Sequence, residues 1–134
     1  MLSINNPGNI RNNASIKYLG EIQPSKNASF KQFETIAYGY RAMFRDLNAK
    51  IQAGTNTISK IIYKYAPPED NNDTVAYINT VCSMTGINKD TVLTYSDQRL
   101  IKIVAAMSKV ENGVLAVLSD VQKGFEMIPL KKKL

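Results

Sequence analysis

The chain has 134 residues and a mass of 14.9 kDa, a size that suits one domain with a single core. It contains no histidine, so every catalytic triad built on imidazole is excluded. Its one cysteine, Cys82, cannot form an internal disulfide, and the formal charge of +6 favours anionic partners in general. Bacterial cell wall and nucleic acid fit that charge about equally well.

The first part of the chain predicts loops followed by two helices. Residues 1–30 are crowded with Asn, Ser, Gly and Pro, which indicates loops with at most a small β-hairpin. From Phe33 the apolar residues follow a helical period, which predicts a helix that continues to Ile51 and stops at Gly54. A second helix is predicted over residues 57–65, because the proline pair after it pushes the preceding residue out of the helical region.

A third helix is predicted between an N-terminal cap and a glycine stop. Asn72 or Asp73 is placed to cap it, and Gly86 is placed to end it. The residues expected to face the core are Val75, Ile78 and Val81 or Cys82.

Two more helices complete the prediction. The fourth is capped by Ser96 or Asp97 and ended by Gly113, and the fifth covers residues 114–125. The connections are short and no internal repeat is present, so we expect one mainly α-helical domain over residues 1–134. Residues 129–134, with their three lysines, are expected to form a basic tail.

The beginning of the chain predicts how the protein is delivered. It lacks a basic segment followed by an apolar one, and no stretch approaches 18 apolar residues. We therefore expect neither a signal peptide nor a membrane span. The protein would be made in the cytoplasm and would reach the cell wall or periplasm by release, injection or virion delivery.

A glutamate stands on the apolar stripe of the fourth helix. Leu100, Val104 and Met107 are spaced by four and three residues, and Glu111 takes the next place in that series. Loss of water and the negative end of the helix dipole would both favour the protonated carboxyl there. Such a glutamate suits general-acid cleavage of a glycosidic bond. The pattern alone favours the alternative, a residue at the rim of the stripe with its carboxylate in water.

Two other stretches contain candidate binding residues. The segment NNPGNIR packs Asn5, Asn6, Asn9 and Arg11 around a Pro-Gly turn. Its amides offer the donors and acceptors that suit N-acetyl and hydroxyl groups of a sugar, although composition alone indicates only a turn-rich segment. The chain has no tryptophan, so stacking on a ligand would fall to its Tyr and Phe residues. Candidates that could line a cleft, or simply pack in the core, are Tyr63, Tyr65 and Tyr77.

These stretches together resemble a group of small phage and gut-bacterial proteins described as structural or lysozyme-like. The resemblance rests on NNPGNIR, the Tyr18-x-Gly20-Glu21 step, SFKQFETIAYGYRAM, TISKIIYKYAPPEDN, TVAYINTV and AAMSKVENG. More distantly, the chain is similar to flagellar-type glucosaminidases, lytic transglycosylases and goose-type lysozymes. Their acid-bearing helix comes first, whereas here the Glu-Asn-Gly helix comes last. The resemblance implies a mainly α-helical, lysozyme-like fold in circularly permuted order, with a small β-hairpin or loop region near the N-terminus.

The resemblance also implies the roles of individual residues. Glu111 would protonate the leaving oxygen of a peptidoglycan glycosidic bond. Glu21 is the candidate second carboxylate, since two-carboxylate glycosidases place the pair roughly 5 to 10 Å apart, but a solvated charge on the hairpin fits its position equally well. A lytic transglycosylase would need Glu111 alone. No metal or organic cofactor is expected. The substrate-binding candidates are Asn5, Asn6, Asn9, Arg11, Tyr18, Tyr65, Tyr77 and Asn112.

Three places depart from the pattern of those enzymes and put substrate preference in question. Tyr18 stands where they have tryptophan, Asn112 where they have serine, and Arg11 where they have lysine. The main hypothesis is a peptidoglycan glycosidase or lytic transglycosylase. The alternative is a non-catalytic component of a phage virion or secretion apparatus that binds cell-wall glycan. We expect no nucleic-acid partner, because the basic residues are scattered and no helix has the pattern of a recognition helix.

Overall fold

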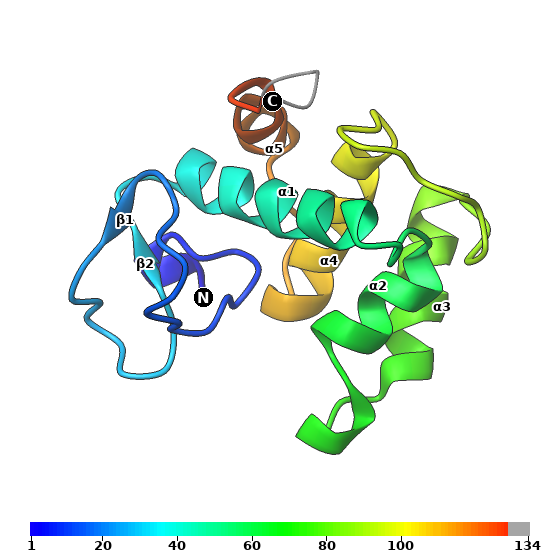
Figure 1. Ribbon diagram of the computed structural model, residues 1–134, viewed down its shortest axis with the longest axis horizontal. Helices are drawn as coiled ribbons and strands as arrows, with labels where there is room; N and C mark the ends of the chain where they lie inside the picture. The colour runs from blue at the N-terminus through cyan, green and yellow to red at the C-terminus, as the bar shows by residue number, and fades with distance from the viewer. Residues whose placement is uncertain (129–134) are drawn as a thin grey trace.

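The computed structural model describes residues 1–128, and the predicted basic tail, 129–134, lies outside them. Within the described range the protein is mainly α-helical with a small antiparallel hairpin near the N-terminus, as the sequence predicts (Figure 1). The helices are α1 (Ile36–Gln52), α2 (Ile58–Tyr65), α3 (Thr74–Thr85), α4 (Leu100–Asn112) and α5 (Leu118–Glu126), and the strands are β1 (Glu21–Ile22) and β2 (Gln32–Phe33). Two short 3-10 turns, η1 (Leu2–Ile4) and η2 (Pro68–Asp70), precede the NNPGNIR loop and α3.

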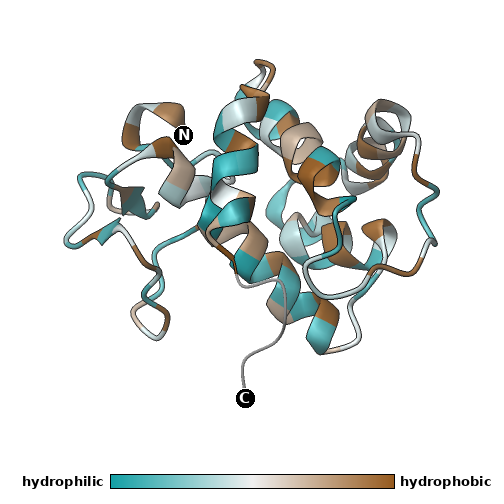
Figure 2. Ribbon diagram, turned by 90° about the horizontal axis from the view of Figure 1, so that it is seen from above, coloured by the Kyte–Doolittle hydropathy of each residue, from teal (hydrophilic) through white to brown (hydrophobic). Residues whose placement is uncertain are grey.

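Helix α1 is the centre of the molecule. It packs against α5, α4, α2 and β2 (Figure 1). Its residues Met43, Phe44 and Leu47 are fully buried, and Phe44 meets Phe125 of α5 edge to face with ring centroids 5.1 Å apart. Figure 2 shows hydrophobic and hydrophilic residues alternating along the helices, as expected for amphipathic helices around a shared core.

The hairpin forms a small lobe beside the N-terminal end of α1. Its register pairs Glu21 with Phe33 and Ile22 with Gln32, and an isolated antiparallel bridge joins Arg11 to Phe30. Phe33 is almost fully buried in β2, so the predicted start of the first helix at Phe33 is wrong. The helix begins three residues later because the Thr35 hydroxyl caps it, accepting the Tyr38 N–H at 3.2 Å.

The predicted caps of α3 are confirmed, and the bounds of α2 are close to the predicted ones. The Thr57 hydroxyl caps α2 and the Asp73 carboxylate caps α3, whose C-terminal cap is Gly86 in the left-handed conformation. The predicted core face of α3 is wrong at one position, since the Val75 side chain is 57% exposed. Tyr77, Ile78 and Val81 face the core instead, and Cys82 is only partly buried.

The beginnings of the last two helices also differ from the prediction. Helix α4 begins at Leu100 without a side-chain cap, because the Asp97 carboxylate accepts the N–H of Arg99 within the preceding turn. Helix α5 begins at Leu118, and residues 114–117 form an exposed, non-helical connection. Among residues 1–128, no helix combines the length and the apolar character that a membrane crossing requires.

Candidate functional site

Glu111 is held by two neutral donors at the end of α4. Its Oε1 accepts a hydrogen bond from Asn9 Nδ2 at 2.8 Å, and its Oε2 accepts one from the Tyr77 hydroxyl at 2.9 Å. Its side chain forms no ion pair with any residue of the described range. The structure therefore brings Asn9 and Tyr77 together around the Glu111 carboxylate. The N-terminal ammonium of Met1, which donates to Asn9 Oδ1, is a nearby positive charge that interacts electrostatically with this carboxylate.

The position of Glu111 follows from the helix that bears it. Leu100, Val104 and Met107 are fully buried, which confirms the predicted apolar stripe. Glu111, the next residue on that stripe, is partly buried. The helix stops two residues later because Gly113 adopts φ 75° and its N–H returns to Lys109 O at 2.8 Å. The carboxylate therefore sits where the buried stripe reaches the surface.

The NNPGNIR loop lies against α1 and α2 through two close approaches. A methyl group added at Gly39 would lie 2.1 Å from Asn5 O, and one added at Gly8 would lie 2.3 Å from Tyr65 Oη. Tyr65 donates its hydroxyl hydrogen bond to Gly8 O. Asn9 then turns in the left-handed region with φ 51° and presents its amide to Glu111. Because even a methyl group would clash at both positions, this placement requires glycine at positions 8 and 39.

Most of the side-chain amides that were predicted to bind a ligand form hydrogen bonds with backbone groups of the protein instead. Asn6 is fully buried, its Nδ2 donates to Ile10 O and Lys31 O, and its Oδ1 accepts from Ile10 N. Asn112 Nδ2 donates to Pro7 O at 2.7 Å and to Ser108 O at 2.8 Å, which joins the end of α4 to the loop. These side chains support the site from behind and leave Asn9 as the loop amide that reaches Glu111.

The two tyrosines near Glu111 are neutral hydroxyl donors. Burial, and then the charge of Glu111, raise the pKa of Tyr77 far above its ordinary value. Burial raises the pKa of Tyr65 well above its ordinary value as well, with the charges of Asp46 and Glu111 as smaller causes. Tyr77 donates directly to the carboxylate, whereas Tyr65 holds the loop that carries Asn9.

Two hollows flank the Glu111 carboxylate, and Asn72 and Glu111 line both. The Tyr77 hollow, of about 350 Å³, lies against α3 and is lined by Asp73, Tyr77 and Thr80 among others. The Arg11 hollow, of about 140 Å³, lies toward the hairpin lobe and is lined by Asn9, Arg11, Phe30, Tyr65 and Asp70 among others. A ligand lying across the two hollows would pass the carboxylate.

Glu21 lies apart from this arrangement. It forms a buried ion pair with Lys31, with Nζ···O distances of 3.0 and 2.9 Å, and both side chains are 2% exposed. Lys31 Nζ also donates to Asn13 O and Ile16 O, so the pair ties the hairpin to the preceding loop. Glu21 lines a different hollow from Glu111. It is not the solvated hairpin charge that the sequence suggested, and its role as second catalytic carboxylate stays a prediction.

Tyr18 belongs to the same lobe as Glu21. Its ring packs against Phe33 with centroids 6.5 Å apart, and burial raises its pKa to about 12. Gly20 adopts φ 77°, and a methyl group there would lie 2.3 Å from Tyr38 Cγ. The Tyr-x-Gly-Glu step therefore builds the hairpin lobe.

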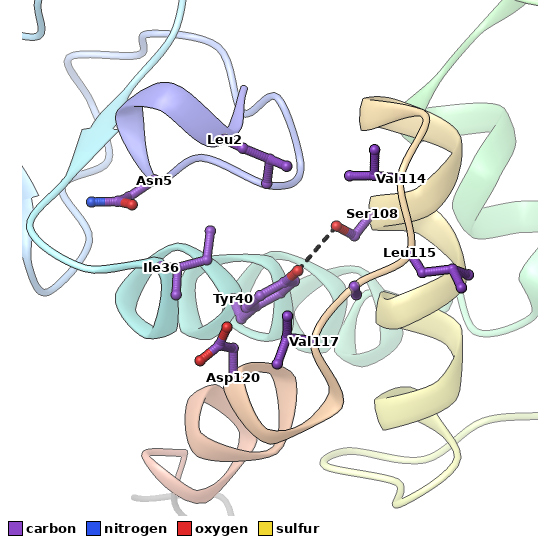
Figure 3. A pocket seen from close by; sticks show the side chains of 10 residues that line it. Leu2, Asn5, Ile36, Tyr40, Ser108, Val114, Leu115, Val117 and Asp120 are labelled. Carbon is purple, nitrogen blue, oxygen red and sulfur yellow. Dashed lines mark hydrogen bonds between the residues drawn. The ribbon is translucent and has the colours of Figure 1, made fainter.

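A third hollow, of about 250 Å³, lies between η1, α1 and the α4–α5 connection (Figure 3). Tyr40 Oη and Ser108 Oγ are hydrogen-bonded beside it at 3.1 Å, and Asp120 is the charged side chain on its wall. Asn5 lines it too, but its Nδ2 donates to Phe33 O at 3.1 Å and to Glu34 O at 3.3 Å. The Asn5 side chain therefore holds the hairpin backbone and makes no hydrogen bond with Glu111. This hollow has a single carboxylate on its wall, so it does not supply the two groups that acid–base catalysis needs.

The segment after α2 contributes site residues that sequence reasoning missed. Asp70, Asn72 and Asp73 all line hollows that include Glu111. The available signal was the run PPEDNND, which is dense in carboxylates and amides and begins two residues after Tyr65. Among residues 1–128, no cluster of three or more His, Cys, Asp or Glu side chains is placed to hold a metal ion.

Comparison with known proteins identifies a phage relative. Protein P5 of Pseudoalteromonas phage PM2 is 35% identical over 126 residues, which cover 91% of this chain and 77% of that protein. The chain belongs to the family of this phage protein. No family model matches the chain. The predicted link to phage proteins is thus confirmed, while the finer likeness to glucosaminidases, transglycosylases and lysozymes stays a prediction.

Proposed function

We propose that the protein cleaves the glycan of bacterial peptidoglycan, with Glu111 as the general acid. The observation that supports this proposal is a carboxylate on a helix end, oriented by Asn9 and Tyr77, with no direct ion pair among the described residues, and flanked by a hollow on each side. A glycosidic bond lying across the carboxylate would place one sugar in each hollow. The Glu111 carboxyl would then protonate the leaving oxygen.

The neighbours of Glu111 suit this role by holding its orientation. Tyr77 stays protonated over the working range of pH, because burial raises its pKa, so it donates to one carboxylate oxygen throughout. Asn9 donates to the other oxygen. A proton donor must lie within hydrogen-bond reach of the oxygen that it protonates, and a carboxyl fixed at both oxygens can be kept in such a position.

The second chemical group determines the type of reaction. Hydrolysis through two carboxylates needs a partner in the same cleft as Glu111. Asp70 and Asp73 are the other carboxylates that line its hollows, so they are stronger candidates than Glu21. If neither takes part, the sugar's own 6-hydroxyl or N-acetyl group would serve, as in a lytic transglycosylase.

The phage relative supports a route to the substrate. Protein P5 is a protein of phage PM2, and a phage must cross the host cell wall. We propose that this protein reaches peptidoglycan with a virion or a secretion apparatus, or after release from the producing cell. The lysozyme-like, circularly permuted architecture is part of the same proposal.

The test is release of soluble fragments from purified peptidoglycan by the wild type and by Glu111→Gln. Loss of the acid should lower release by at least about 100-fold. Glu126→Gln on α5 is the matched control, since Glu126 is exposed and lines none of the hollows described above. Mass spectrometry separates hydrolysed from anhydro products. Equal release by wild type and Glu111→Gln would refute the proposal.

A specific surface feature supports the second candidate, a non-catalytic phage component. In the α4–α5 connection and the start of α5, a run of large apolar side chains is more than half exposed: Val114, Leu115, Val117 and Leu118. Such a patch is typical of contact with another protein. If wild type and Glu111→Gln both co-sediment with peptidoglycan and neither releases fragments between pH 4 and 8, the binding or structural role is the correct one.

A further inference from the structure

Arg11 presents an unused guanidinium to one of the two hollows beside Glu111. Its Cζ lies 5.2 Å from the centroid of the Phe30 ring, and the backbone bridge between the same two residues fixes the base of the side chain. In the described part of the chain the guanidinium forms no ion pair and no hydrogen bond. Its donors are therefore free to meet a ligand while the aromatic ring supports the cation.

The two hollows differ in charge. The Arg11 hollow contains one cation and the carboxylates of Asp70 and Glu111. The Tyr77 hollow contains the carboxylates of Asp73 and Glu111, and no cationic side chain lines it. An anionic group would meet attraction from Arg11 in the first hollow and repulsion alone in the second. A chain of alternating neutral and acidic sugars would thus be held in one preferred register.

We propose that the Arg11 hollow receives the carboxylate-bearing sugar of the glycan, and the Tyr77 hollow its neutral neighbour. This inference rests on the proposed function, since it orients a glycan across Glu111. Peptidoglycan alternates N-acetylglucosamine, which is neutral, with a muramic acid unit, whose lactyl group ends in a carboxylate or continues into an acidic peptide. A planar guanidinium matches a carboxylate with two parallel hydrogen bonds. Arg11 is thus a specificity residue that selects which of the two alternating bonds lies over Glu111.

The test measures binding without turnover, in the Glu111→Gln background. The probes are soluble peptidoglycan fragments, either native or with their carboxyl groups converted to amides by carbodiimide and ammonia. Titration calorimetry should show about tenfold tighter binding of the native fragments, the effect of one charge-assisted hydrogen bond. Adding Arg11→Gln should remove that preference, because it should weaken binding of the native fragments by about tenfold and binding of the amidated fragments by much less.

Two further variants separate recognition from general charge. Lys17→Gln removes one exposed cation that lines neither hollow and should leave the preference intact. Asp70→Asn removes a carboxylate that shares the hollow with Arg11, and it should increase the preference for native fragments by about two- to threefold.

Each outcome bears on a distinct claim. Equal loss of affinity for both probes on Arg11→Gln, or the same loss on Lys17→Gln, would overturn the role of Arg11 while leaving cleavage by Glu111 in place. Equal affinity of the unsubstituted Arg11 protein for native and amidated fragments would also overturn the role of Arg11. Failure of both probes to bind, together with no cleavage by the wild type, would remove the proposed function and this inference with it.

Discussion

Two glutamates of this protein stand in opposite surroundings. Glu21 lies in the hairpin lobe, 2% exposed, with its charge balanced by Lys31. Glu111 lies at the end of α4, partly buried, with two neutral donors and open hollows on either side. The sequence offered both residues as candidate carboxylates for the same reaction. Glu21 therefore stabilises the fold, whereas Glu111 remains accessible to a ligand.

The difference shows what a buried charge is used for. A carboxylate taken out of water needs a partner of opposite charge or several hydrogen bonds. Glu21 has both, since the Tyr18 N–H and Gln23 Nε2 also donate to it. Both carboxylate oxygens of Glu21 therefore accept hydrogen bonds from residues of the hairpin lobe. Glu111 keeps contact with the hollows, so a ligand can replace water around it.

The same substitution at the two positions should separate these roles most clearly. Glu21→Gln leaves the Lys31 ammonium buried without its counter-charge, so we expect the free energy of unfolding to fall by about 3 to 5 kcal/mol. Glu111→Gln keeps the shape and removes a charge that forms no direct ion pair in the described chain and meets the Met1 ammonium only beyond ion-pair distance, so we expect a change below about 1 kcal/mol. Urea denaturation measures both. Similar losses for the two variants would contradict the distinction.

A glycine next to the site should give the next largest effect. Gly8→Ala places a methyl group 2.3 Å from Tyr65 Oη and 2.7 Å from Met43 Cγ, so we expect a loss of about 1 to 3 kcal/mol in unfolding free energy. The movement should also draw Asn9 away from Glu111 and lower any cleavage. Removing the hydroxyl with Tyr65→Phe should recover part of the loss in the double variant. Strictly additive losses would show that the hydroxyl contact is not the cause.

Loss of a single neutral donor to Glu111 should cost less. Tyr77→Phe removes the hydroxyl that donates to Oε2 at 2.9 Å, and water in the adjoining hollow can replace it. We expect a loss of about 1 kcal/mol in unfolding free energy, together with a larger fractional loss of glycan cleavage. Thermal unfolding and the fragment-release assay check the two parts. Unchanged cleavage would show that Tyr77 does not orient the acid.

The smallest expected effect is at the other end of α4. Asp97 pairs with Arg99 at 2.8 Å, and hydrogen bonds from Arg99 lower the pKa of Asp97 from 3.8 to about 2. A carboxylate with a lowered pKa stabilises the folded state above its unfolded pKa, and this contribution disappears as the pH falls through the folded value. Because Arg99 is exposed to solvent, which screens the pair even though the Asp97 side chain is only 9% exposed, Asp97→Asn should cost below about 1 kcal/mol at pH 7. The difference from wild type should shrink between pH 4 and 2, and a constant difference would exclude the ion pair as its source.

The sequence predicted local features well and long-range partners poorly. The proline pair located the end of α2, and the caps Asp73 and Gly86 located α3, because each of these residues acts on backbone only a few residues away. The same reasoning placed Glu111 on its stripe. It could not find Lys31 as the partner of Glu21, since the hairpin lobe has no period and a buried lysine looks in sequence like a surface one.

The start of α1 and the composition of the site show the same limit. Phe33 fits the helical period of the residues after it, but it lies in β2, where pairing with Glu21 fixes an extended backbone. Asn9 and Tyr77 were candidates by residue type, yet their meeting at Glu111 depends on how α3, α4 and the loop pack. Asp70 and Asp73 were overlooked because a turn-rich acidic run is usually solvent-exposed surface.

The bond between Asn9 and Glu111 joins residues 102 positions apart, and this separation has a consequence during synthesis. The ribosome makes the loop first and the acid only after α1, α2 and α3. A chain interrupted anywhere before the end of α4 carries the asparagine-rich loop without the carboxylate it orients. Any activity that needs the pair therefore begins only when translation has passed Glu111.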